Sequence, residues 1–439
     1  MVRAFALARA AISQVRATSS QHAVLVKNSG ALAIGTGATA VLGFVYWWLA
    51  AQYFPPAAIG RASALLSLMG FVGLLGDAGL GTLLAGEIIR RPGQEAGLIS
   101  AAALTVLTLS LAAGGVGLVI SDLTFDAFGR GAGSHGLAAL WFLAGCGLTG
   151  LCFIFDQAFL GMLRTAIRMW RLLLFSICKL VLIAAAAVWS ASGSAILVTW
   201  VAGLMVSLIF VELIMRRGGS SLIQRPDFLL LHALRRKAAD HYLLDLASQT
   251  PSMILPYIVT VILSPATNAA FYALWMVFTV AAVGPAAIAT VLYPVVRAEP
   301  AQYRDRMLLS LSVSLVFAVA FGFFVLACSQ DVLRVFNPVY AQIAGDDLRF
   351  LGFGMIGSVV KFQICTAARL TNTMRRTSAW FWAGGVLEIG GAIGGCQVYG
   401  FEGLAIGWVA AILIEAALMS LLAFHAGQLT LAQHALDGS

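Results

Sequence analysis

Residues 96–120 read AGLISAAALTVLTLSLAAGGVGLVI, 25 consecutive residues without a charged side chain. A helix that crosses the hydrocarbon core of a bilayer needs about 20 predominantly apolar residues. This stretch therefore predicts a membrane-spanning helix. Apolar runs of similar length, separated by short polar or basic segments, recur along the whole chain.

Twelve such runs are present in the 439 residues. We place the spans near 28–52, 61–89, 96–120, 136–162, 168–190, 194–215, 241–263, 268–296, 307–328, 348–369, 377–399 and 402–424. Twelve spans require about 240 apolar residues, and 60% of the chain is hydrophobic while only 10% is charged. A soluble domain carries about 25% charged residues. The sequence predicts an all-α integral membrane protein with about 12 transmembrane helices.

The basic residues predict how these helices are oriented. Of the 27 Lys and Arg, 21 precede the first span or lie in or beside the even-numbered connections, and only four fall on the opposite side. Because positive charge in short loops stays in the cytoplasm, we expect the even-numbered connections and both termini to be cytoplasmic. The net charge of +8 then reflects orientation in the membrane, and no nucleic-acid partner is indicated.

The longest connection divides the spans six and six, which favours two bundles arranged as a parallel repeat. We expect a cytoplasmic N-terminal segment at 1–27, a first six-helix bundle at 28–215, a basic cytoplasmic linker at 216–240, a second bundle at 241–424 and a cytoplasmic tail at 425–439.

Two basic residues, Lys179 and Lys361, lie inside predicted spans, where a charge needs a water-filled cavity or a partner. An ammonium group at this depth can pair with the phosphate of a lipid, or with a buried carboxylate. We regard both lysines as candidate phosphate-binding residues and leave pairing with Asp or Glu as the alternative.

Acidic residues inside the spans are the candidates for lining a cavity or coupling transport to an ion. Asp77 lies in the glycine-rich segment Leu75-Gly76-Asp77-Ala78-Gly79, which permits close helix approach or a local break. Asp156 and Lys179 are expected at similar depth on adjacent antiparallel helices, either as a buried ion pair or as part of a cavity wall. Glu388 lies near the middle of the eleventh span.

The sequence contains no convincing enzyme or metal motif. The six cysteines all lie in apolar runs without a C-x-x-C pair. Gly352-Phe-Gly354-Met-Ile-Gly357 matches a dinucleotide fingerprint but does not follow a strand. We therefore expect no catalytic residue, no metal and no cofactor, and we do not expect an enzyme.

Several segments resemble Wzx-like polysaccharide flippases. They include Gly35-Thr-Gly-Ala-Thr-Ala-Val-Leu-Gly-Phe-Val-Tyr-Trp-Trp-Leu-Ala with Tyr53-Phe-Pro-Pro-Ala-Ala-Ile-Gly60, Asp156-Gln157-Ala-Phe-Leu-Gly161-Met-Leu-Arg164, and Asn268-Ala-Ala-Phe-Tyr272-Ala-Leu-Trp275. The similarity covers roughly residues 28 to 300, and the last third departs from the pattern.

The resemblance implies a member of the multidrug, oligosaccharidyl-lipid and polysaccharide flippase superfamily. It implies two six-helix bundles around a central cavity and alternating access. It further implies transfer of a polyprenyl-pyrophosphate-linked oligosaccharide to the outer leaflet of the bacterial inner membrane, for cell-surface polysaccharide (lipopolysaccharide) biosynthesis. Cavity cations hold the pyrophosphate in such families, a role that falls on Lys179 and Lys361. Lipid-linked oligosaccharide and membrane lipids are then the partners, with a polysaccharide polymerase and glycosyltransferases as further ones.

Two other functions remain open from the residues. An ion-coupled multidrug antiporter has the same expected architecture, although the first span, 28–52, contains no Asp or Glu. A membrane glycan polymerase or ligase would carry acids in an outer loop, and the outer connections near 121–135 and 329–347 do contain several. These loops are short, however, and show no D-x-D spacing.

Overall fold

The computed structural model describes residue 35 and residues 37–91, 93–128, 135–189, 192–218, 224–298 and 303–425. The predicted N-terminal segment 1–27 and residues 426–439 of the predicted tail lie outside this range. All regular secondary structure in the described part is helical.

The first half of the chain forms the helical residues 37–53 and six labelled α-helices. Their bounds are α2 Pro56–Asp77, α3 Leu80–Glu87, α4 Glu95–Phe125, α5 His135–Gly161, α6 Thr165–Trp189 and α7 Gly193–Arg217. The predicted span 61–89 is thus divided between α2 and α3. The break falls at Ala78 and Gly79, which both have left-handed backbone angles, with φ of 47° and 76°. A short 3₁₀ turn, η1 (Ile88–Arg90), follows α3.

The second half contains α8 Phe228–Ile262, α9 Pro265–Ala298, α10 Tyr303–Phe336, α11 Pro338–Ala344, η3 Leu351–Phe353, α12 Gly354–Leu370 and α13 Met374–His425. α8 begins 13 residues before the predicted span at 241 and continues through it, so the second part of the predicted linker is helical. α13 is bent into two helices by non-helical backbone at Tyr399 and Gly400, where Gly400 has a φ of 61°.

The helices account for the predicted number of spans. Nine helices of the described residues are long and apolar enough to cross a membrane. One of them is α13, which contributes two crossings because of its bend. Residues 37–53 and α8 complete the predicted twelve. The chain is an all-α integral membrane protein, as its composition predicted.

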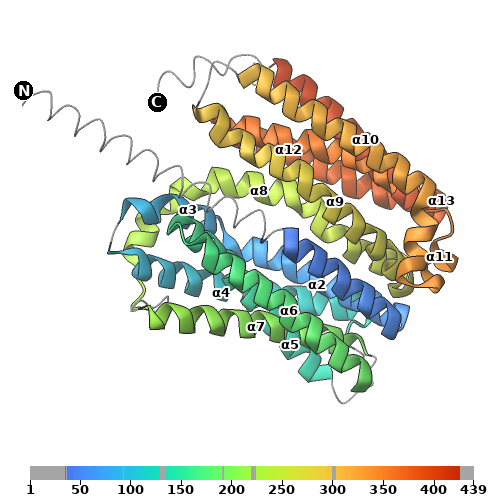
Figure 1. Cartoon of the computed structure of the whole chain (residues 1–439), viewed down its shortest axis with the longest axis horizontal. Helices are drawn as coiled ribbons and strands as arrows, with labels where there is room; N and C mark the ends of the chain where they lie inside the picture. Colours follow the sequence, from blue (N-terminus) through green and yellow to red (C-terminus); the bar gives the residue numbers. More distant parts are fainter. Residues whose placement is uncertain are drawn as a thin grey trace, which may run out of the picture.

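α2 lies at the centre of the molecule and packs against α4, α5 and α7 of its own half and against α8 and α9 of the other. In Figure 1 the helices from α2 to α7 form one group and those from α9 to α13 another, with α8 and α9 beside α2. A single large apolar core runs through both groups, because side chains of both halves contact each other around α2 and α9.

The two halves are joined closely at one end of the helices. There Trp48 Nε1 donates to the carbonyl oxygen of Val335 at 2.9 Å, and Asn337 Nδ2 donates to that of Ala51 at 2.6 Å. Asn268 Nδ2 donates to the carbonyl oxygen of Gly60 at 2.9 Å. A Cβ on Gly60 would overlap the carbonyl oxygen of Pro265, so only glycine permits α2 to approach the start of α9 this closely. We call this region the closed end.

Candidate functional site

A cavity of about 480 Å³ lies between α2, α8, α9, α12 and α13. Its lining begins at Leu66, six residues after Gly60 and therefore about 9 Å from the closed end along α2. Aromatic side chains form much of the wall, with Tyr272, Trp275 and Phe278 on one helix face of α9. An apolar, aromatic cavity with a few polar groups is the usual form of a small-molecule binding site.

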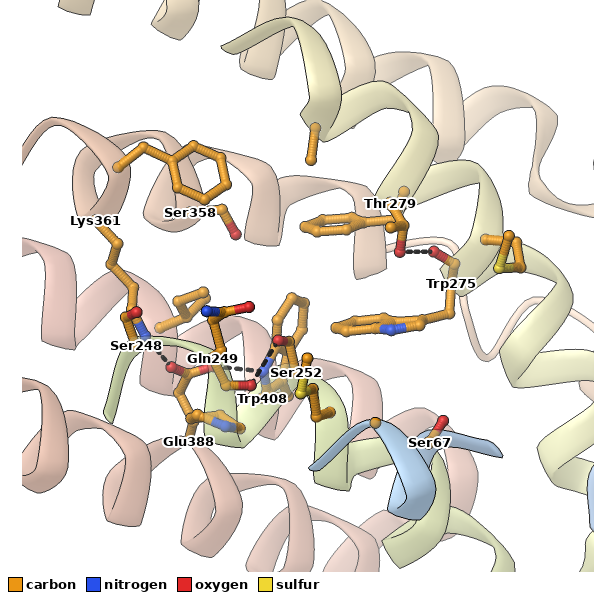
Figure 2. Close-up of a pocket in the computed structure, with 18 of the residues that line it drawn as sticks. Ser67, Ser248, Gln249, Ser252, Trp275, Thr279, Ser358, Lys361, Glu388 and Trp408 are labelled. Atoms are coloured by element: carbon orange, nitrogen blue, oxygen red, sulfur yellow. Dashed lines mark hydrogen bonds and ion pairs between the residues drawn. The ribbon is translucent and has the colours of Figure 1, made fainter. Parts of the chain in front are cut away.

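The charged residues among those described along this cavity are Lys361 on α12 and Glu388 on α13. Lys361 Nζ donates to Glu388 Oε1 and lies 3.1 Å from the carboxylate of Glu415. Trp408 Nε1 donates to the second oxygen of Glu388 at 2.8 Å. Figure 2 shows Lys361 and Trp408 converging on Glu388 from opposite sides, with Trp275 across the cavity. We call Lys361, Glu388 and Glu415 the buried triad, because none is more than 6% exposed.

Glycines in the bent helix α13 bring the two carboxylates together. A Cβ on Gly395 would overlap the carbonyl oxygen of Gly403, and one on Gly407 would overlap that of Gly391. Small residues at four-residue spacing permit this close packing of helix backbones. Further along, a Cβ on Gly384 would overlap the Glu415 carboxylate itself. The two parts of α13, before and after its bend, form a helical hairpin. The glycines fix the register of this hairpin and leave room for Glu415 beside Lys361.

Lys179 lies in a different environment in the first half. Its side chain is 4% exposed, and its Nζ is 3.8 Å from the ring centre of Trp200, 4.6 Å from that of Phe175 and 5.0 Å from that of Tyr46. Among the described residues, no Asp or Glu forms an ion pair with this ammonium group. Cation–π contacts are its main stabilisation. We call these three rings the lysine cage.

Aromatic contacts connect the lysine cage to the cavity wall. Trp200 contacts Trp47, with ring centres 6.2 Å apart, and Trp47 contacts Tyr272 of α9 at 4.7 Å. Tyr272 lines the cavity, whereas Lys179 is not among its lining residues. The contact between Trp47 and Tyr272 crosses between the two halves. Lys179 is thus separated from the cavity by the rings of Trp200, Trp47 and Tyr272 in succession.

Asp156 does not pair with Lys179, contrary to one of our two expectations for this residue. It accepts from Arg171 Nε at 2.7 Å and from Arg171 Nη2 at 2.5 Å, and Arg168 lies 3.7 Å away. Asp156 is five residues from the end of α5, and Arg171 is six residues from the start of α6. The short turn between these helices therefore places Asp156 level with Arg171, whereas Lys179 lies eight residues, or about 12 Å, deeper.

Asp77 serves the helix break that its neighbouring glycines suggested. Its carboxylate accepts a hydrogen bond from the backbone N–H of Gly81 at 3.1 Å. This N–H lies in the first turn of α3, where it has no hydrogen-bond partner within the helix. A carboxylate is also favourable at a helix N-terminus because of the helix dipole. Tyr242 Oη on α8 donates to the carbonyl oxygen of Leu75 at 2.9 Å, which ties the end of α2 to the second half.

The predicted residues therefore occupy four separate places. Lys361 and Glu388 are together in the cavity wall, Lys179 is in the lysine cage, Asp156 is paired with Arg171, and Asp77 caps α3. Glu415, the third member of the buried triad, was not among the candidate residues predicted from the sequence. Trp408 and the aromatic wall were not predicted either, because aromatic residues in a span look the same whether they face lipid or a cavity.

Comparisons with known proteins identify similar folds only among solved structures. No protein-family model matches the chain, and no curated protein matches it in sequence. Solved structures of a multidrug resistance MATE family transporter of the MOP superfamily align with TM-scores of 0.68 in the inward-facing conformation and 0.67 in the outward-facing one. The identities are 16% and 18%, over 91% and 93% of this chain and 96% of each solved chain.

A further match is a MOP superfamily transporter from Pyrococcus furiosus, described as having a binding pocket of reversed polarity. It aligns with a TM-score of 0.67 at 17% identity, over 95% of this chain and 96% of that one. At these identities the likeness is one of architecture: this chain has the fold of the MOP superfamily transporters.

Proposed function

We propose that the chain is a flippase that moves a polyprenyl-pyrophosphate-linked oligosaccharide across the membrane by alternating access. The fold supports a transporter, since its relatives in architecture are transporters solved in inward-facing and outward-facing states. The choice of an anionic, lipid-linked substrate rests on one observation, the buried ammonium of Lys179 without a carboxylate partner among the described residues.

A buried ammonium group normally has a counter-ion, because taking an ion out of water costs several kcal/mol. The rings around Lys179 replace only part of that hydration. The group therefore keeps the capacity to bind a substrate anion, and the electrostatic attraction to a phosphate is strong in a medium of low dielectric constant. Lys361 already has two carboxylates beside it. Its predicted phosphate-binding role would require their displacement, so Lys179 is the first candidate.

The cavity and the closed end suggest where the substrate enters. The closed end joins the loops that the distribution of basic residues assigns to the outer face, and the cavity lies on the other side of it. The structure then corresponds to an inward-facing state. In the opposite state the halves separate at the closed end. That movement separates Trp47 from Tyr272 and exposes Trp47, which contacts Trp200 of the lysine cage.

Lys179→Met and Lys179→Arg test this proposal. In proteoliposomes we expect Lys179→Met to lower the flipping rate of a polyprenyl-pyrophosphate glycan by at least tenfold, which corresponds to about 1.4 kcal/mol of lost interaction. Lys179→Arg keeps the charge and should retain part of the rate. Lys179→Met is an isosteric exchange into apolar surroundings, so the protein level should stay normal. An unchanged rate for Lys179→Met at equal protein level would contradict the anionic-substrate proposal.

An ion-coupled multidrug antiporter is the second candidate, and the buried triad favours it. Two glutamates face one lysine, so the triad has a formal excess of one negative charge when all three groups are ionised. Glu388 reaches the cavity with its aromatic walls, a combination that also suits an organic cation. Proton- or sodium-dependent efflux of small organic cations from vesicles, with no effect of a lipid-linked glycan, would decide for this function.

For a flippase, a polysaccharide polymerase and glycosyltransferases are the expected partners, and a bacterial inner membrane is the expected location. Depletion of the protein in its host should then cause lipid-linked glycan to accumulate on the cytoplasmic leaflet. Appearance of that glycan outside at the normal rate would count against the flippase.

A further inference from the structure

A second cavity, remote from the first, lies on the lipid-facing surface of the first half. It has a volume of about 630 Å³ and is lined by residues of α4, α5 and α7 and by Gln224 and Pro226. α4 and α7 each pack against α5 but make few contacts with each other. Leu148, Leu151 and Phe155 of α5 therefore form the floor of an open groove between two helices. We call it the lateral groove.

The length and lining of the lateral groove match one lipid tail. Along α7 it extends from Met205 to Arg216, eleven residues or about 16 Å. That is about half the 30 Å thickness of the hydrocarbon core and hence the depth of one leaflet. Its walls include exposed apolar side chains, with Leu104 at 47% and Ile209 at 53%. An empty gap of this size would forfeit dispersion contacts on both sides, so a flexible hydrocarbon chain is its natural filling.

One end of the lateral groove is polar and basic. Arg216 lines it, held by Glu212 through a contact of 2.7 Å to its Nε, and its side chain is 63% exposed. Most of the Arg216 side chain is therefore accessible, and Arg217 and Arg225 lie nearby in the chain. Residues 224–227 cross this end, since Gln224 N donates to Ser100 Oγ at 2.8 Å and Asp227 N to the carbonyl oxygen of Gly97 at 3.0 Å.

We propose that the lateral groove binds an anionic phospholipid, with one acyl chain along α5 and the headgroup phosphate on Arg216. The apolar part of the groove would hold the acyl chain. Arg216 would bind the headgroup phosphate, because a guanidinium pairs with phosphate through two parallel hydrogen bonds. The excess of arginine over acid at this end distinguishes an anionic headgroup from a zwitterionic one. This site is independent of the function proposed for the central cavity.

The test uses the full-length purified protein in mild detergent, exposed to an equimolar mixture of phosphatidylglycerol and phosphatidylethanolamine with the same acyl chains. Retained lipid is counted by native mass spectrometry. We expect one phosphatidylglycerol per protein in preference to phosphatidylethanolamine. Arg216→Gln should lower that preference by about fivefold, the effect expected from one basic residue near an anionic headgroup. Ala103→Phe, which fills the groove, should remove the retained lipid of either kind.

Two matched variants serve as controls. Arg90 forms a similar pair with Glu87 at a helix end outside the groove, and Val116 is a 61% exposed residue further along α4. Arg90→Gln and Val116→Phe should leave the retained phosphatidylglycerol unchanged. The proposal is overturned if the wild type shows no preference, if the controls lose lipid equally, or if a polyprenyl phosphate added to the mixture displaces the phospholipid. Because Arg216→Gln changes only an exposed side chain, it answers the question even if Ala103→Phe fails to fold.

Discussion

At the scale of single residues, the balance of charge in the buried triad determines what a substitution does. Lys361 neutralises one of two carboxylates that are each 2% exposed, and Trp408 donates to Glu388. Removing one partner of a buried ion pair leaves an uncompensated charge and costs about 3 to 5 kcal/mol, whereas replacing the whole set by neutral groups is often tolerated. The triad should therefore behave as a unit.

Lys361→Met should lower the unfolding temperature in detergent strongly, because it leaves two glutamates facing each other in the protein interior. The triple variant Lys361→Met, Glu388→Gln, Glu415→Gln should recover most of the loss. Thermal unfolding followed by intrinsic fluorescence measures both. Equal destabilisation in the single and triple variants would show that the lysine acts through its packing and not through its charge.

Asp156 and Arg171 form a second buried unit that differs from an ordinary surface pair. The Arg171 side chain is 3% exposed and makes two hydrogen bonds to Asp156, whereas that of Arg216 is 63% exposed. Asp156→Asn should cost about 3 to 5 kcal/mol of unfolding free energy. Glu212→Gln, which removes the partner of an exposed arginine, should cost under about 1 kcal/mol. Denaturant titration of both variants checks this, and similar losses would mean that the Asp156 pair contributes no more than a surface contact.

At the scale of elements, the bend and the glycines of α13 assemble the triad's two glutamates, Glu388 and Glu415, from opposite sides of the bend. Gly391 and Gly395 face the second part of the hairpin, where a Cβ would overlap backbone, whereas a Cβ added to Gly390 or Gly394 would meet no atom within 4 Å. The two pairs of glycines are adjacent in sequence and lie on different faces of the same helix. They provide a comparison in which helix propensity is identical and only the packing differs.

Gly391→Ala and Gly395→Ala should each destabilise the protein, because the added methyl group pushes the two parts of α13 apart and moves Glu388 away from Glu415. Gly390→Ala and Gly394→Ala should be neutral or stabilising, by up to about 1 kcal/mol, since alanine favours the helix over glycine. Thermal unfolding of the four variants makes the comparison. If all four behave alike, the glycines have no role in setting the register of the hairpin.

The spans and the break between α2 and α3 could be predicted from the sequence, whereas the partners of the buried charges could not. The apolar runs and the positions of arginine predicted the number of spans, and the glycines around Asp77 pointed to the break between α2 and α3. The partners of the charges were not predictable in the same way. Arg171 looks like a helix-end residue that reaches the interface, as such residues usually do, but its rotation about α6 turns it inward to Asp156. Likewise, only the register of α13 reveals that Glu415 meets Lys361.

At the scale of the whole molecule, the closed end holds the two halves in one relative position. Its hydrogen bonds between the halves have backbone carbonyl groups as acceptors, at Val335, Ala51 and Gly60. Such hydrogen bonds contribute only about 0.5 to 1.5 kcal/mol each. The close approach of α2 to α9 at Gly60 adds dispersion contacts that glycine alone permits. Together these interactions are specific enough to define one relative position of the two halves.

Gly60→Ala should shift the molecule away from this state, because its methyl group would overlap the carbonyl oxygen of Pro265 in the other half. Spin labels at Tyr53→Cys and Val339→Cys report the separation, since both positions are exposed near the closed end and lie in opposite halves. With the six native cysteines replaced, double electron–electron resonance should give a longer and broader distance distribution for Gly60→Ala. Gly86→Ala, where the added Cβ meets no atom within 4 Å, should match the parent protein. An unchanged distribution for Gly60→Ala would mean that contacts elsewhere hold the halves together and that the closed end follows them.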